Sequence, residues 1–221
     1  MARSRILITA AGGLLLVIAM AGEAIALDGK EIFAASCASC HNAAGPAPAT
    51  FQGVLQRKAP DLFYAGSKFK REWLVRWTQN PTPIRPSGVM FLNHITTEDG
   101  KDRIKKETIA SCPSKLNPQE AEAVADYLMS LQDAKMRTGV VNRDKKFSTS
   151  VASRLFTKQY PCVGCHAVRI GGRESGGASG PSLTDAGERL NPDWVYARID
   201  NPQYWDPKTW MPKIDLSHEK R

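Results

Sequence analysis

The sequence lacks several features that would point to other classes of protein. Its longest apolar stretch, roughly residues 6–20, is shorter than the ~20 residues that a membrane-spanning helix needs and contains Gly12 and Gly13. The basic residues are scattered, with no nucleic-acid-binding module beside them. No glycine-rich loop precedes a helix with the Lys-Ser/Thr signature of a phosphate-binding loop. We therefore expect neither a nucleic-acid-binding protein nor a phosphate-binding loop.

The first 26 residues have the order of an export signal. Arg3 and Arg5 precede the apolar stretch, and Ala24 and Ala26 supply the small residues of a cleavage site. We therefore expect a signal peptide over residues 1–26, a periplasmic protein and no stable membrane span after cleavage; an uncleaved membrane anchor is the alternative. After cleavage 28 basic and 21 acidic residues remain, a net charge of about +7. This charge either favours an acidic protein partner or is a solvated basic surface.

Cysteine is scarce, with five in 221 residues, but its spacing is informative. Four of the five fall in two Cys-x-x-Cys-His motifs, the pattern of covalent c-type haem attachment. The two thiols of a motif can bond the two vinyl groups of one haem, while the adjacent imidazole binds its iron. A zinc site is the alternative, and it is disfavoured because neither motif has a second half at zinc-finger spacing. The motifs predict two haem c groups, with thioether bonds from Cys37, Cys40, Cys162 and Cys165 and iron ligation by His41 and His166.

A gapless internal repeat relates the two halves of the chain. Residues 59–98 match residues 180–219 at a constant offset of 121, whereas the haem motifs are 125 residues apart. The loop after the first motif is therefore four residues longer than its counterpart. The equivalent pairs include Pro60 and Pro181, Trp73 and Trp194, and Met90 and Met211.

With these motifs in view, both halves resemble class I cytochrome c, whose pattern runs Cys-x-x-Cys-His, Gly-Pro-x-Leu, an aromatic helix, Asn-Pro and Met-Pro. The resemblance implies an all-α fold of two tandem cytochrome c-like domains wrapped around covalent haems. We expect the first domain at residues 28–131, a short polar linker at residues 132–146 and the second domain at residues 147–221. Only ten residues follow Met211, so the second domain lacks the family's closing helix. The first domain, a partner, or residues missing at the C-terminus could complete it.

The resemblance also implies the second axial ligand of the second haem. Met211 is followed by Pro212, as in the Met-Pro segment of the family. Thioether sulfur favours ferrous iron and raises the reduction potential relative to a pair of histidines. Pro60 and Pro181 resemble the family proline whose carbonyl accepts the proton of the proximal imidazole.

The second axial ligand of the first haem has more than one candidate. Met90 is the repeat equivalent of Met211 and is favoured, although Phe91 replaces the usual proline. Cys112-Pro113 is the alternative, because it resembles a Met-Pro segment and leads into a helix that Asn117 is expected to cap. His94 is a remote third.

Further expectations concern the segments around the motifs. The Gly- and Ser-rich residues 171–180 are expected to form a mobile loop near the second haem. Apolar residues at helical spacing before each motif are expected to lie in the core. They are Ile32 and Phe33 in the first half, and Val151, Leu155 and Phe156 in the second.

The expected function follows from the ligand count. An iron with two axial protein ligands has no open position for a substrate, and the sequence contains no catalytic constellation. We therefore expect a periplasmic protein that passes single electrons between a redox donor and an acceptor, both of them proteins. The alternative is a dihaem enzyme or the cytochrome subunit of an oxidoreductase complex, for example one resembling thiosulfate dehydrogenase, which a thiolate from Cys112 would favour.

Overall fold

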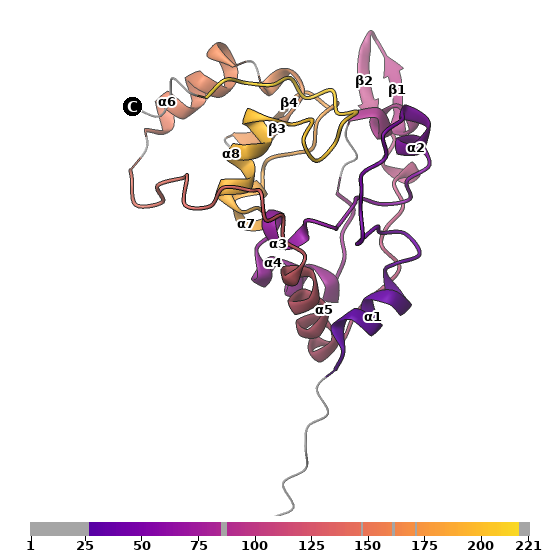
Figure 1. The fold of residues 1–221 in the computed structure, drawn as a ribbon. Coiled ribbons are helices and arrows are strands. Elements are labelled where there is room, and N and C mark those ends of the chain that lie inside the picture. Colours follow the sequence, from indigo (N-terminus) through magenta and orange to yellow (C-terminus); the bar gives the residue numbers. More distant parts are fainter. Residues whose placement is uncertain (1–26, 85–87, 147, 161, 171, 217–221) are drawn as a thin grey trace, which may run out of the picture.

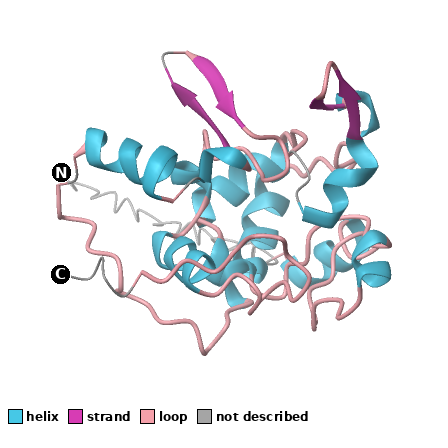
Figure 2. Cartoon of the chain, turned by 90° about the horizontal axis from the view of Figure 1, so that it is seen from above, coloured by secondary structure: helices cyan, strands magenta, loops and turns pink. Residues whose placement is uncertain are grey.

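The computed structural model describes residues 27–84, 88–146, 148–160, 162–170 and 172–216. Most of their regular structure is helical, as the sequence predicts, but the fold is not all-α: two small antiparallel hairpins lie at the periphery of the helices (Figure 1, Figure 2). No helix in the described ranges is long and apolar enough to cross a membrane. The expected signal peptide, residues 1–26, lies outside them.

The first half has one α-helix before the first motif and several after it. Its helices are α1 (Gly29–Ser36), α2 (Phe51–Leu55), α3 (Ala65–Lys68), α4 (Arg71–Gln79) and α5 (Pro118–Ser130). Between α4 and α5 lie a 3-10 helix, η1 (Gly88–His94), an antiparallel hairpin of β1 (Ile95–Glu98) and β2 (Lys101–Ile104), and the short η2 (Lys106–Thr108).

The second half repeats part of this arrangement. It contains α6 (Thr149–Arg154), the π-helical turn η3 (Leu155–Gln159), η4 (Cys162–Gly164), the hairpin of β3 (Ala167–Ile170) and β4 (Arg173–Gly176), α7 (Ala186–Arg189) and α8 (Pro192–Asp200). The bounds of α7 and α8 lie 121 residues after those of α3 and α4. The repeat in the sequence is therefore a repeat of structure.

Helix α5 starts where the sequence predicts. The Asn117 side chain accepts a hydrogen bond from the Glu120 N–H, and the Glu120 carboxylate accepts one from the Asn117 N–H, which completes a capping box. Pro118 occupies the first turn, where its missing N–H has no consequence. Val124 and Leu128 face the core and are almost fully buried.

The first haem motif is fixed by the packing of α1 against α5. Phe33 of α1 is 3% exposed, and its ring lies 5.3 Å from that of Tyr127 in α5. The backbones approach so closely that a Cβ on Gly29 would lie 1.9 Å from the carbonyl oxygen of Ala123. A side chain at position 29 would therefore push α1, and the motif that follows it, away from α5.

Helix α6 does not reproduce that packing, so one core expectation is wrong. Val151 is 45% exposed, and Leu155 and Phe156 are only half-buried. In the described part of the chain α6 packs mainly against η3, because the second half has no counterpart of α5. An apolar helical face remains exposed where no second helix covers it.

The two halves meet through residues that are equivalent in the repeat. Phe69 and Leu190, 121 residues apart, form an isolated antiparallel bridge. The Lys70 N–H donates to the Arg189 carbonyl at 3.0 Å, and the equivalent Asn191 N–H donates to the Lys68 carbonyl at 2.8 Å. The segment around Phe69 therefore pairs with its own repeat equivalent around Leu190, as in a two-fold symmetric interface.

A single hydrophobic core extends across this junction. Trp194 and Trp205 of the second half lie in one buried cluster with Phe33, Leu74 and Val124 of the first. Tyr64 lies between the halves, with ring centroids 6.5 Å from Trp194 and 6.0 Å from Trp205. The halves are therefore packed against each other; their division into two domains stays a prediction.

The segment expected to be a linker, residues 132–146, is bound to the second half. The Asp193 carboxylate accepts hydrogen bonds from the N–H groups of Gly139, Val140 and Val141 at 2.8–3.0 Å. Burial opposes ionisation of Asp193, but these donors lower its pKa below the ordinary value. Asp193 therefore fixes the connection between the halves.

We expect Asp193→Ala to lower the free energy of unfolding by about 3 kcal/mol, because hydrogen bonds to a buried charged group are lost and three N–H donors lose their acceptor. Since the folded-state pKa is depressed, this stability is present above the ordinary pKa of 3.8 and is lost as pH falls through the lower folded value. Urea unfolding at several pH values measures the loss. The exposed Asp144→Ala is the control, and equal stabilities of the two variants at pH 7 would contradict the role of Asp193.

Candidate haem sites

The first motif forms a turn at the end of α1. Cys37 terminates the helix, and the N–H groups of Cys40 and His41 both donate to its carbonyl, at 3.1 and 3.0 Å. Cys40 is exposed and Cys37 is half-buried. The turn brings two thiols and an imidazole to one face of the backbone, the arrangement that covalent haem attachment needs.

The second motif forms the same turn. The N–H groups of Cys165 and His166 donate to the Cys162 carbonyl at 3.1 and 2.8 Å. Here too the first cysteine is half-buried and the second is exposed. The two motifs are thus alike in backbone geometry as well as in sequence.

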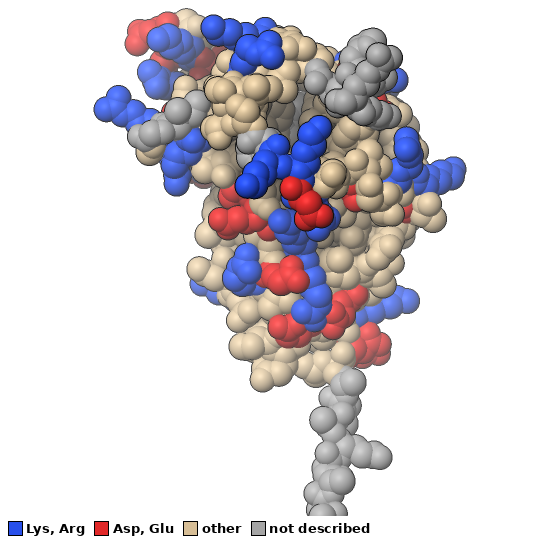
Figure 3. All heavy atoms as spheres, turned by 90° about the vertical axis from the view of Figure 1, so that its left-hand side faces the viewer, with Lys and Arg blue, Asp and Glu red and all other residues tan. Residues whose placement is uncertain are grey.

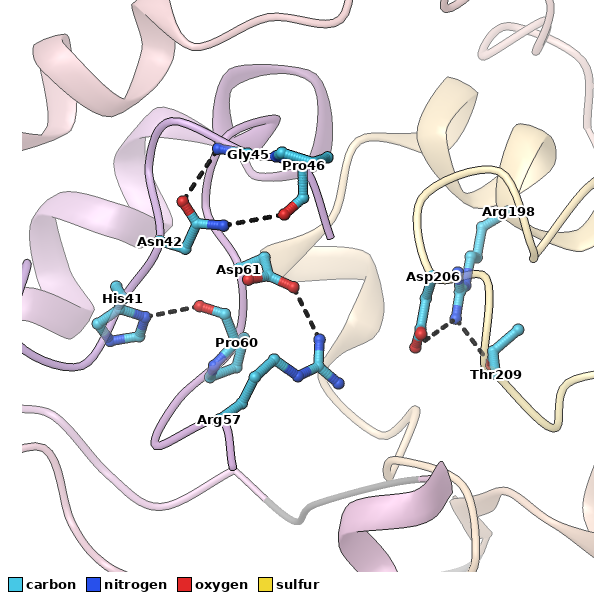
Figure 4. Close-up of polar contacts among 10 residues, drawn as sticks. All are labelled: His41, Asn42, Gly45, Pro46, Arg57, Pro60, Asp61, Arg198, Asp206 and Thr209. Carbon is cyan, nitrogen blue, oxygen red and sulfur yellow. Dashed lines mark hydrogen bonds and ion pairs between the residues drawn. The ribbon is translucent and has the colours of Figure 1, made fainter. Parts of the chain in front are cut away.

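Each motif histidine is oriented by a proline carbonyl. His41 Nδ1 lies 2.8 Å from the Pro60 oxygen (Figure 4). His166 Nδ1 lies 2.9 Å from the Pro181 oxygen. A carbonyl can only accept, so the proton is on Nδ1, and Nε2 is the unprotonated nitrogen, the form of the ring that can bind a metal. The sequence predicts both contacts, and the structure contains both.

Burial keeps the first imidazole neutral. It lowers the pKa of His41 below the ordinary value of 6.5, although the Pro60 carbonyl and Asp61 act in the opposite direction. A neutral ring is the form that binds iron. The loop after His41 is fixed by Asn42, which accepts from the Gly45 N–H at 2.9 Å and donates to the Pro46 carbonyl at 3.2 Å (Figure 4).

The Gly- and Ser-rich segment is attached to the second motif, so the prediction of a mobile loop is wrong. Its Gly177 N–H donates to the Val163 carbonyl at 2.8 Å, and its Gly180 N–H donates to the Cys165 carbonyl at 2.7 Å. A Cβ on Gly180 would lie 2.7 Å from the His166 ring. The glycines therefore allow the backbone to pack directly on the motif.

Cys112 lies near the thiols of the first motif. Burial, together with the neighbouring thiols of Cys112 and Cys40, raises the pKa of the Cys37 thiol to about 11. The Ser114 hydroxyl donates to the Ser36 carbonyl at 2.6 Å, which attaches the Cys112 segment to the end of α1. The structure thus brings together a pair of cysteines that are 75 residues apart in the sequence.

Met90 and His94 lie in a different part of the first half. Both belong to η1, which packs against α2 near the β1–β2 hairpin, away from the contact of α1 with α5 (Figure 1). Met90 is half-buried. His94 Nδ1 lies 2.8 Å from the Thr108 hydroxyl oxygen, and that hydroxyl donates to the Lys105 carbonyl at 2.7 Å.

Met211 is half-buried in a segment that is attached to α8. The Arg198 guanidinium donates to the carbonyl of Pro202 and, at 3.1 Å, to the hydroxyl of Thr209, which accepts from the Met211 N–H at 3.3 Å. Gln203 donates to the Met211 carbonyl at 3.2 Å. The Met211 backbone is therefore anchored by side chains of the second half.

The donor chemistry of these residues fits a porphyrin better than a zinc ion. In the described residues no three His, Cys, Asp or Glu side chains converge as a metal cage would require. Each motif instead provides two thiols beside one imidazole that is oriented through its Nδ1. Buried donors without a partner, Arg189 Nε and Trp194 Nε1, lie in the second half. An anionic, largely apolar group such as haem could satisfy them.

Sequence reasoning did not identify the charged residues between the two sites. Arg57 forms an ion pair with Asp61 at 2.8 Å, and Arg198 lies 3.8 Å from Asp206 (Figure 4). Asp61 is 4% exposed, next to the proline that accepts from His41. One signal was available, since Lys68 and Arg189 are both cations and are equivalent in the 121-residue repeat.

Comparison with known proteins bears on the first half most directly. Residues 26–132 match the family model of cytochrome c. Over 192 residues the chain is 26% identical to the cbb3-type cytochrome c oxidase subunit FixP of Sinorhizobium medicae (strain WSM419). The aligned residues make up 84% of this chain and 54% of that protein. The chain thus spans about half the length of the curated relative it matches, and no solved structure matches it. Residues 26–132 are accordingly similar to a cytochrome c domain, which supports a helical, haem-binding fold for this part of the chain.

Proposed function

We propose that the protein is an exported cytochrome with two covalent haems that passes single electrons between redox proteins. The observation that supports this most directly is the recurrence of one geometry. Both motif histidines donate their Nδ1 proton to a proline carbonyl, at 2.8 and 2.9 Å. The first site lies in the part of the chain that matches cytochrome c. Because the second half repeats its geometry, we propose a haem there as well.

The residues of the chain bind and orient, and the cofactor supplies the redox couple. Haem iron, when bound, exchanges one electron between its ferric and ferrous states. His41 and His166 present Nε2 as the proximal donor, and the carbonyls of Pro60 and Pro181 fix each ring and increase its basicity. Met211 is the second ligand of the second haem. Its sulfur favours the ferrous state.

Cys112 is the second ligand that the structure favours for the first haem, in place of Met90. Its sulfur is close enough to Cys37 to affect the pKa of that thiol, and its segment is bonded to the helix that carries the motif. The segment that begins at Cys112 leads into α5, the helix that packs on α1. A thiolate would give the first haem a much lower reduction potential than a thioether. The two haems would then differ strongly in potential.

We place the protein in the periplasm, with protein partners on both sides of the electron path. The similarity to an oxidase subunit makes a larger respiratory complex one candidate setting. Lys and Arg are spread over the face shown in Figure 3, with Asp and Glu between them. A diffuse positive charge speeds encounter with an acidic partner without defining one docking site.

A second candidate function is a dihaem enzyme, for example one that oxidises thiosulfate. The position of Cys112 beside the first motif is the observation that favours it, because the resemblance that suggests thiolate ligation is to cytochromes of sulfur-compound oxidation. Such an enzyme needs an iron position that opens to substrate. Ligation by both Cys112 and His41 would leave none at rest.

The number of haems is tested by intact mass. Protein made in a host with a cytochrome c maturation system is expected to have the mass of two covalent haems. Cys162→Ala combined with Cys165→Ala removes both thioether bonds of the second haem, so one haem remains. Cys112→Ala, which removes a thiol outside the motifs, retains two. Wild-type protein with a single haem would refute the proposal.

The ligand of the first haem is tested by near-infrared magnetic circular dichroism of the oxidised protein. We expect one thiolate-ligated and one methionine-ligated haem, with the thiolate signature lost in Cys112→Ala and retained in Met90→Ala. Cys112→Met is expected to raise the lower reduction potential, because a neutral sulfur replaces an anionic one. Two methionine bands that persist in Cys112→Ala, one of them lost in Met90→Ala, would instead assign Met90.

Turnover distinguishes the carrier from the enzyme. Thiosulfate, sulfite and peroxide should each be consumed at the background rate, because both irons have two protein ligands. Stopped-flow reduction by a small-molecule electron donor should nevertheless be complete for both haems. Rapid consumption of any of the three compounds by the two-haem protein would favour the enzyme.

A further inference from the structure

A half-buried lysine lies at the junction between the halves. Lys68 ends α3 directly before the Phe69–Leu190 bridge, and its Nζ lies 4.8 Å from the Phe69 ring and 5.1 Å from the Trp194 ring. The Tyr64 ring is 5.6 Å away. Burial lowers the pKa of Lys68 to about 7, and the positive charges of nearby arginines act in the same direction.

At this junction there are more positively charged side chains than nearby carboxylates. Three arginines act on Lys68 together with a single carboxylate, that of Asp61. Asp61 is bonded to one of the arginines, Arg57, at 2.8 Å, whereas Arg189 and Arg198 have carboxylates only at 3.8 Å. No carboxylate of the described residues forms an ion pair with Lys68. A buried excess of cations is costly unless an anion accompanies it.

Two buried donors at the same junction have no acceptor. Arg189 is 6% exposed and Trp194 is 7% exposed, and neither Arg189 Nε nor Trp194 Nε1 has a hydrogen-bond partner. Trp194 lies beside the Lys68 ammonium, and the charge of Arg189 acts on it. Buried polar groups are nearly always hydrogen-bonded in native proteins. These donors therefore indicate a ligand with acceptor oxygens.

The junction adjoins both haem motifs. On the first side, Lys68 and Asp61 both influence the pKa of His41. On the second, Arg189 donates to the Ser182 carbonyl at 3.4 Å, and Ser182 directly follows Pro181, the acceptor of His166. An anionic group attached to either haem could reach this junction.

We infer that Lys68, Arg189, Arg198 and the Trp194 indole form one carboxylate-binding site, shared by the propionates of the two haems. The inference rests on the proposed function, because it requires a haem in each half. It assigns residues of both halves to one site at their interface, so both haems are positioned by one shared set of side chains. Lys68 and Arg189 are positioning residues, since they act on the iron only through its porphyrin.

The site has a direct effect on the redox equilibrium. Reduction adds a negative charge to each haem, and cations near its carboxylates stabilise the reduced form. Loss of a cation from this site is therefore expected to lower the reduction potential. The effect should be larger for the haem adjoining the lost cation: the first for Lys68 and the second for Arg189.

The first test needs no substitution. In wild-type protein with ¹³C-labelled propionate carboxyl groups, infrared difference spectroscopy reports whether these groups are ionised. We expect them to remain ionised well below the ordinary carboxyl pKa of about 4.3. Titration at the ordinary value, in protein whose mass shows two haems, would overturn the site and leave the proposed function intact. A mass with fewer than two haems would instead overturn the proposed function.

The second test uses matched variants. In Lys68→Gln and Arg189→Gln we expect the ferrous-to-ferric ratio of the adjoining haem, at fixed ambient potential, to fall about tenfold, a shift of about 59 mV for one electron. Arg189→Lys keeps the charge and should restore most of the ratio. The exposed Lys101→Gln, in β2, is the control. Unchanged ratios in folded two-haem variants would overturn the site.

A free carboxylate ion from solution is the alternative to a haem propionate as the group that the junction binds. If the junction binds the propionates, the wild-type potentials should not depend on whether acetate or chloride is the salt at constant ionic strength. A potential that changes saturably with acetate concentration would show that the junction binds a free anion, and would overturn the assignment to haem.

Discussion

The geometry of both candidate haem sites depends on which nitrogen of the motif histidine carries the proton. With the Nδ1 proton of each motif histidine donated to a proline carbonyl, Nε2 is the unprotonated nitrogen, and the hydrogen bond fixes the orientation of the ring. The segments between histidine and proline differ: the first contains α2, and the second contains the β3–β4 hairpin. Both segments nevertheless return the chain to the same contact. Near this contact α1 packs against α5 in the first half, and Gly180 packs against the motif in the second half.

The second constraint is the burial of positive charge between the halves. A lysine among aromatic rings and an arginine with an unpartnered Nε are unfavourable in an apolar interface unless negative charge accompanies them. Together with the shared core around Tyr64, Trp194 and Trp205, this links the packing of the halves to the cofactors. Electron exchange between the two sites and stability of the interface would then depend on the same side chains.

The sequence predicts the local parts of this arrangement well. The repeat offset of 121 relates α7 and α8 to α3 and α4 residue for residue, and the predicted Asn117 cap of α5 is present, because both depend on neighbouring residues. Contacts between distant segments could not be predicted in the same way. The carboxylate of Asp193 binds residues more than 50 positions away, and α6 is exposed because a packing partner is missing. The proximity of Cys112 to Cys37 likewise depends on the path of the whole first half.

The Phe69–Leu190 bridge joins two positions that correspond in the repeat, so the surface that each half presents there is self-complementary. A single-repeat ancestor could have formed the same contact with a second copy of itself, at a strength set by its concentration. Joining the copies in one chain makes the encounter intramolecular and independent of dilution. The surroundings of the two Cys-x-x-Cys-His motifs were then free to diverge while the junction between the halves was kept.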